Sequence, residues 1–143
     1  MVIYADTSFL FSLYASDGNS AKAHEECLEA PVAFTVFQRH ELFNALHLAE
    51  FRKVITAEQS HAIQALIATD IQCGTLAEIQ VNWEEVYARA ETLSSTYTPK
   101  TGCRALDILH VAIALSLNLD VFYTFDVRQQ CLARKAGLTV RPT

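Results

Sequence analysis

Two short apolar runs, near the two ends of the chain, each stop at an aspartate. Residues 2–5 precede Asp6, and residues 121–125 precede Asp126. Apolar runs this short are typical of strands buried on both faces, which occur in parallel sheets covered by helices. Ligands of such sheets bind beyond the carboxyl ends of the strands. The pattern therefore predicts an α/β fold in which acids lie at one edge of the sheet.

The rest of the chain alternates strand-like and helix-like segments. Further strands are predicted over residues 32–36, 76–81 and 138–140. Apolar spacing, capping residues and breakers predict helices over residues 8–15, 19–30, 38–55, 56–73, 82–99 and 105–118, with a short one up to 136. Pro99 is expected to end its helix, and the helix over 105–118 is apolar nearly all round and therefore central. Strands that alternate with one or two helices indicate a parallel sheet.

The length and charge of the chain restrict its class. Its 143 residues predict a single domain, 1–143, and the apolar run 108–117 is too short to span a bilayer. The N-terminus lacks a basic segment and does not resemble a signal peptide, so we expect a cytoplasmic protein with no membrane partner. The formal net charge of -5 argues against a broadly basic surface for nucleic acid. A nucleic-acid partner would need positive charge from another source.

Several common motifs are missing. The four glycines are too scattered for a dinucleotide-binding or phosphate-binding loop. The pair His40-Glu41 begins like a zinc-protease helix, but position 44 is asparagine, so H-E-x-x-H is absent. The four cysteines form no C-x-x-C pair and are most simply core thiols.

Four acids stand at the ends of predicted elements. Asp6 and Asp126 follow strands, Glu41 lies near the start of the helix after the second strand, and Asp107 lies in the first turn of the central helix. Each acid taken singly is explained by helix capping or by the helix dipole. Taken together, neighbouring carboxylates repel by roughly 4 kcal/mol per pair at 4 Å. Such a cluster needs a cation, and oxygen ligands suit Mg²⁺ or Mn²⁺.

Four segments then carry a resemblance to a known family. They are Asp6-Thr7-Ser8, Glu41 with Asn44, Arg104-x-x-Asp107-x-x-His110, and Thr124-Phe125-Asp126-x-Arg128-Gln129. In this order and spacing they resemble the PIN-domain family, over essentially the whole chain. The resemblance implies a PIN-like three-layer α/β/α fold, with a central parallel sheet of about five strands.

The resemblance also implies an activity and partners. PIN-like chains of this kind are metal-dependent endoribonucleases, which hydrolyse RNA phosphodiester bonds. Small single-domain members are commonly VapC-like toxins that pair with a small antitoxin and form homodimers. The implied partners are therefore single-stranded or structured RNA, an antitoxin protein and a second copy of the chain.

The site residues follow from the same resemblance. It implies that Asp6, Glu41, Asp107 and Asp126 bind Mg²⁺ or Mn²⁺ and carry catalysis. Thr7 or Ser8 would add a hydroxyl beside the metal, and Asn44 would orient Glu41 or touch substrate. The remaining supporting residues are Thr124, Arg104 and Arg128, of which the two arginines are the nearest cations for an RNA phosphate.

Two rival functions remain open at this point. One is a non-catalytic PIN-like binding module for a cation, RNA or a protein, although a binding role does not need four acids. The other is a phosphoaspartyl enzyme, but Asp6-Thr7-Ser8 lacks the second acid expected two positions on, and no lysine ends a late strand. The apolar residues of segment 9–14 are too many for one buried stripe, so they belong either to the core or to a partner surface.

Overall fold

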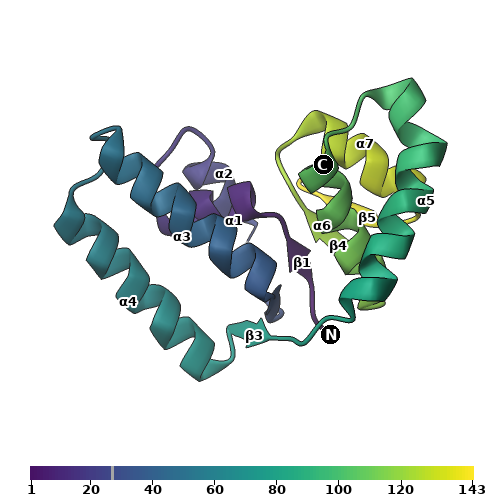
Figure 1. The fold of residues 1–143 in the computed structure, drawn as a ribbon. Coiled ribbons are helices and arrows are strands. Elements are labelled where there is room, and N and C mark those ends of the chain that lie inside the picture. The colour runs from purple at the N-terminus through teal and green to yellow at the C-terminus, as the bar shows by residue number, and fades with distance from the viewer. Residues whose placement is uncertain (27) are drawn as a thin grey trace. The chain divides into compact units, whose positions relative to one another are not determined.

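The computed structural model describes residues 1–26 and 28–143. Cys27, which the sequence places in a helix, lies outside the described residues. The chain divides into two compact units, Met1–Ile79 and Gln80–Thr143. Figure 1 labels their helices and strands. That the whole chain acts as one domain stays a prediction.

The first unit alternates strands and helices. Its elements are β1 (Tyr4–Ala5), α1 (Thr7–Tyr14), α2 (Ser20–Glu25), β2 (Val32–Phe34), α3 (Val36–Phe51), α4 (Ala57–Cys73) and β3 (Leu76–Glu78). Strands β2 and β3 pair in parallel, with Val32 opposite Leu76. A parallel bridge also joins Ile3 to Val32. The predicted parallel α/β character is confirmed.

The core of the first unit answers the question about segment 9–14. Phe9 and Leu10 are fully buried, as are Leu42, Leu46 and Ile67 from the helices α3 and α4. Each such side chain contributes roughly 1.5–3 kcal/mol by leaving water. Other residues of the segment, Phe11, Leu13 and Tyr14 among them, are only partly buried. One face of α1 is therefore core, and the other remains accessible within the unit.

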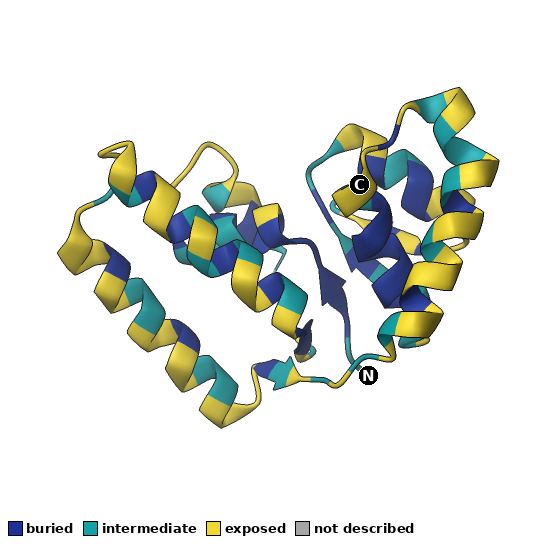
Figure 2. Cartoon of the chain, viewed as in Figure 1, coloured by how far each residue is buried: buried dark blue, intermediate teal, exposed yellow. Residues whose placement is uncertain are grey.

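The second unit is built around one buried helix. Its elements are α5 (Trp83–Thr101), α6 (Ala105–Ser116), β4 (Val121–Tyr123), α7 (Val127–Lys135) and β5 (Thr139–Arg141). Seven consecutive residues of α6, Ile108–Ala114, are buried, which Figure 2 shows as a dark stretch. Strands β4 and β5 pair in parallel, with Val121 opposite Thr139. The prediction of a central helix is confirmed for this unit.

Several predicted boundaries are wrong where a cap decides them. Strand β2 stops at Phe34 and α3 begins at Val36, because Thr35 caps the helix. The same helix ends at Phe51 rather than 55, shortly before Lys53 adopts a positive φ of 58°. Other elements are also shorter than predicted. Strand β1 begins at residue 4, and α2, β3, α6 and β4 end at residues 25, 78, 116 and 123.

Pro99 does not end its helix, contrary to the sequence prediction. It lies inside α5, which continues to Thr101 and stops at Gly102 with φ of 64°. Proline removes the hydrogen bond to the carbonyl four residues earlier. That carbonyl belongs to Ser95, which is exposed, so water can replace the lost donor. The chain therefore completes one more half turn before the glycine takes the left-handed conformation.

None of the described helices combines the length and the apolar character that crossing a membrane requires.

Candidate active site

Asp6 stands where β1 ends and α1 begins. Its Oδ1 accepts a hydrogen bond from the Phe9 N–H at 2.8 Å, so the carboxylate caps α1. The Ser8 hydroxyl lies 3.1 Å from both carboxylate oxygens. The side chain is buried, with 4% exposure. A carboxylate offers about four acceptor positions, so capping leaves room for a further ligand.

Glu41 lies close to Asp6 in the first unit. It sits in the second turn of α3, and the Thr7 hydroxyl donates to its Oε1 at 2.7 Å. The pKa of the buried Tyr4 hydroxyl is raised above 10.0, first by burial and then by the charges of Asp6 and Glu41. Both acids therefore act on the same hydroxyl group. Asn44 follows one turn later on α3 and is exposed.

A second pair of acids lies in the second unit. Asp107 occupies the first turn of α6, and Asp126 caps α7 by accepting from the Gln129 N–H at 2.8 Å. Arg104 contacts both: its Nε lies 3.1 Å from Asp107 Oδ2, and its Nη2 lies 3.6 Å from Asp126 Oδ2. The arginine side chain is 69% exposed.

The remaining candidates of this unit, Thr124 and Arg128, lie on either side of Asp126 in the sequence. The Thr124 hydroxyl accepts the Asp126 N–H at 3.0 Å and is buried. Arg128 is exposed in the first turn of α7. His110 is buried within α6, as expected for a packing histidine.

The acids fit a hard divalent cation as pairs. Within residues 1–26 and 28–143, no group of three or more His, Cys, Asp or Glu side chains is gathered closely enough to hold a metal. Mg²⁺ is commonly bound by only one or two carboxylates and keeps several of its waters. The oxygen donors of each pair therefore suit Mg²⁺ or Mn²⁺. The convergence of all four acids on one ion stays a prediction.

Two residues near these acids received no role in the sequence analysis, although Gln129 stands in one of the quoted segments. Gln38 and Gln129 are both fully buried, and each occupies the third position of a helix. The signal was present as Thr35-x-x-Gln38 and Asp126-x-x-Gln129, which both resemble a capping box. The structure shows a complete box at Thr35–Gln38 and another at Thr56–Gln59.

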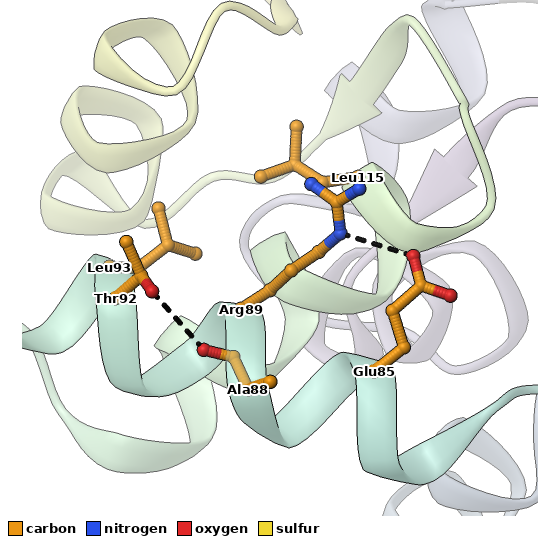
Figure 3. A pocket seen from close by; sticks show the side chains of 6 residues that line it. All are labelled: Glu85, Ala88, Arg89, Thr92, Leu93 and Leu115. Atoms are coloured by element: carbon orange, nitrogen blue, oxygen red, sulfur yellow. Dashed lines mark hydrogen bonds and ion pairs between the residues drawn. The ribbon is translucent and has the colours of Figure 1, made fainter.

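A surface hollow in the second unit takes no part in this chemistry. It has a volume of about 440 Å³. Figure 3 shows the residues that line it: Glu85, Ala88, Arg89, Thr92, Leu93 and Leu115. Its charged groups, Arg89 and Glu85, pair with each other at 3.3 Å. None of the ten candidate residues lines it.

Comparison with solved structures shows the same fold in proteins of low sequence identity. VapBC-1 from nontypeable Haemophilus influenzae matches with a TM-score of 0.63 and 19% identity, covering 99% of this chain and 97% of that chain. FitAcB from Neisseria gonorrhoeae gives 0.64 and 17%, covering 98% and 96%. VapBC2 from Rickettsia felis, bound to a DNA fragment from its promoter, gives 0.68 and 15%, covering 99% and 98%.

Comparison with families is more specific than comparison of folds. No curated protein matches this chain. The PIN domain pattern, in contrast, matches residues 3–136, which include all four acids and both glutamines. The chain belongs to the PIN domain family.

Proposed function

We propose that this chain is a metal-dependent endoribonuclease, which hydrolyses RNA phosphodiester bonds and serves as the toxin of a toxin/antitoxin pair in the cytoplasm. The observation that carries the proposal is the pairing of acids at helix starts. Asp6 lies near Glu41 in one unit, and Asp107 lies near Asp126 in the other. Membership of the PIN domain family supports the same reading.

The four carboxylates are the proposed ligands of Mg²⁺ or Mn²⁺. A bound ion of this kind lowers the pKa of its water and neutralises charge on the scissile phosphate. The chain contributes orientation. The Phe9 and Gln129 N–H groups hold Oδ1 of Asp6 and of Asp126. The Thr7 hydroxyl donates to Oε1 of Glu41 at 2.7 Å and so fixes the orientation of that carboxylate.

RNA binding by an acidic protein needs local positive charge. Arg104 and Arg128 are exposed close to the second acid pair in sequence, and Arg104 contacts both of its acids. Asp107 and Asp126 would hold a divalent cation in the proposed site, and they would then not need the positive charge of Arg104. The arginine would then be available for an RNA phosphate, which accepts bidentate hydrogen bonds from a guanidinium group.

A small antitoxin is the proposed inhibitor, and a second copy is the proposed partner in a homodimer. The likeness to VapBC and FitAcB structures supports an antitoxin. In the first unit, a hollow of about 300 Å³ is lined by Leu13 and Tyr14 of α1, together with residues of α2, α4 and β3. Apolar side chains of an amphipathic antitoxin helix would fit such a hollow.

The decisive experiment replaces Asp6 by asparagine. Asparagine caps helices as well as aspartate does, so Asp6→Asn should keep the bond from Phe9 and leave stability within about 0.5 kcal/mol. It removes the charge that a cation needs. We expect RNA cleavage with Mn²⁺ to fall at least a hundredfold, measured on labelled single-stranded RNA with thermal unfolding in parallel.

The matched control is Asp120→Asn, which changes an exposed acid away from the four candidates. It should cleave like the wild type. Cleavage at the wild-type rate by Asp6→Asn would remove Asp6 from the site. If the wild type binds Mn²⁺ or RNA but cuts nothing, the chain is a non-catalytic PIN-like binding module instead.

The antitoxin is tested by sequencing the neighbourhood of the gene and expressing the chain together with any small reading frame found beside it. We expect a small protein that co-purifies and blocks cleavage. Leu13→Asp should weaken that complex without reducing cleavage by the free chain. Purification from the native host with no stoichiometric partner, and unhindered growth on overexpression, would contradict the toxin assignment.

A further inference from the structure

Two fully buried glutamines occupy equivalent positions in the two units. Gln38 is the third residue of α3, and Gln129 is the third residue of α7. A primary amide is costly to bury unless its donors and acceptor find partners. The contacts of each amide therefore show what the residue does.

In the first unit, the structure of the helix start accounts for Gln38. Its Oε1 accepts the Thr35 N–H at 2.8 Å and completes the capping box. Its Nε2 donates to the carbonyl oxygen of Ala5 at 2.8 Å. Ala5 immediately precedes Asp6, and Glu41 follows Gln38 by one helical turn. The oxygen of the amide thus binds the start of α3, which carries Glu41, and its nitrogen binds the residue before Asp6.

In the second unit, Gln129 makes only half of this arrangement. Its Nε2 donates to the carbonyl oxygen of Asp107 at 3.2 Å. Its Oε1 is buried and has no hydrogen-bond partner. The capping task that Gln38 Oε1 performs in α3 falls in α7 to the Thr124 hydroxyl, which takes the Asp126 N–H. The helix cap therefore does not need the carbonyl end of Gln129.

An orphaned buried acceptor opposes folding, so a glutamine here needs another explanation. The remaining contact of its side chain crosses from α7 to α6 and joins the helix that Asp126 caps to the first turn that carries Asp107. Arg104 also contacts both acids, but it is 69% exposed, and exposed ion pairs hold side chains weakly. Gln129 is the buried connection between the two acids.

We propose that Gln129 is a positioning residue, which sets the separation of the Asp107 and Asp126 carboxylates for a divalent cation. The inference rests on the proposed metal-dependent function. Mg²⁺ requires near-ideal octahedral geometry, so a small displacement of one carboxylate weakens binding. Partners that orient metal ligands typically change affinity 10–100-fold when they are removed.

The test is Gln129→Met in the full-length chain. Methionine has a similar length and shape, cannot donate to Asp107, and removes the orphaned acceptor. We expect the melting temperature of the metal-free protein to stay the same or rise. We expect the dissociation constant for Mn²⁺, measured by calorimetry, to rise at least tenfold. Cleavage should fall at limiting Mn²⁺ and recover as Mn²⁺ is raised, with KM for RNA within twofold of the wild type.

The control is Gln64→Met on α4. It removes another hydrogen bond that a side-chain amide donates, from Gln64 to the Ser60 hydroxyl at 3.1 Å. It should bind Mn²⁺ like the wild type. Gln129→Leu provides a second variant without the donor. If neither Gln129 variant folds, Gln129 is a structural residue and the inference is wrong.

The inference and the proposed function fail in different ways. Wild-type Mn²⁺ affinity and wild-type cleavage in Gln129→Met would overturn the positioning role alone. A wild-type chain that neither binds Mn²⁺ nor cuts RNA would contradict the proposed function, and the positioning role would fall with it.

Discussion

Asp6 and Asp126 show how one residue can serve both the fold and a site. In each, Oδ1 caps a helix by accepting the N–H of the third helical residue at 2.8 Å. An N-cap of this kind contributes roughly 1 kcal/mol. A carboxylate has about four acceptor positions, so accepting one backbone N–H does not by itself prevent it from binding a cation. Capping and metal binding are therefore compatible roles for these two acids.

Arg104 offers a prediction about charge. Arg104→Gln removes a cation that lies between two acids but is mostly exposed, so stability should change by less than about 1 kcal/mol. Its loss should strengthen Mn²⁺ binding, because the acids no longer have a competing cation, and should raise KM for RNA. Calorimetry and cleavage kinetics measure the two effects.

Arg89→Gln is the matched control for Arg104. Arg89 is also an exposed arginine in an ion pair, with Glu85 on α5, and lies outside the candidate residues. It should leave both measurements unchanged. Equal Mn²⁺ affinities in Arg104→Gln and the wild type would show that Arg104 does not compete with metal.

Tyr4 gives the chain a defined response to alkaline pH. Burial, followed by the charges of Asp6 and Glu41, raises its pKa well above 10.0 in the folded state. The unfolded chain releases this proton near pH 10, whereas the folded chain retains it. The contribution of Tyr4 to stability is therefore complete below pH 10. It falls by about 1.4 kcal/mol per pH unit above that, until the folded pKa is reached.

Tyr4→Phe should flatten this decline. Urea unfolding at pH 9, 10 and 11 measures the slope of unfolding free energy against pH in both proteins. The slopes, rather than the absolute stabilities, carry the comparison, because phenylalanine also removes the hydroxyl contacts. Parallel slopes would show that the Tyr4 proton does not distinguish the folded from the unfolded chain.

At the scale of elements, the start of α3 links helix formation to the first acid pair. Thr35 is buried and accepts the Gln38 N–H at 3.3 Å, while its own N–H donates to the side chain of Gln38. The same glutamine donates to the carbonyl oxygen of Ala5, the residue that precedes Asp6. A change in the cap should therefore alter the positions of the acids as well as the stability of the helix.

Thr35→Ala should cost about 1–2 kcal/mol of stability and also weaken Mn²⁺ binding. The comparison is Thr56→Ala, which breaks the capping box of α4, where Thr56 and Gln59 are exposed. That variant should lose about 1 kcal/mol or less and keep the wild-type affinity for Mn²⁺. Identical Mn²⁺ affinities in the two variants would show that the α3 cap does not affect the positions of the acids.

At the scale of the whole molecule, metal binding should stabilise the fold. A ligand that binds only the folded state contributes about 2.7 kcal/mol at a hundredfold excess over its Kd. For a chain of this size, we expect the melting temperature to rise by several degrees with Mn²⁺ and to return with EDTA. Asp107→Asn should remove most of the rise, and Asp120→Asn should keep it.

A melting temperature independent of Mn²⁺ in the wild type would contradict a metal site of useful affinity. An unchanged rise in Asp107→Asn would remove Asp107 from the ligands while leaving the metal site itself in place. Scanning calorimetry of the wild type and of Asp107→Asn, each with and without Mn²⁺, distinguishes the two results.

Local patterns in the sequence were sufficient for the parts of the fold that neighbouring residues decide. The end of the strand before Asp6, the start of the helix after Thr56 and the buried character of the helix that begins at Ala105 depend on contacts within one or two turns. Local rules failed at Pro99, where the carbonyl that loses its donor belongs to an exposed residue, Ser95. They also failed at Thr35, whose cap was read as part of a strand.

The sequence by itself determined which acids are candidates for the site, because acids after short apolar runs and at helix starts are a local signal. Only the tertiary structure decided which of them meet. Thr7 reaches Glu41 across 34 positions, and Gln129 reaches Asp107 across 22. Such contacts depend on how helices pack and on which buried amides need partners. Periodicity within one segment contains no information about the position of another.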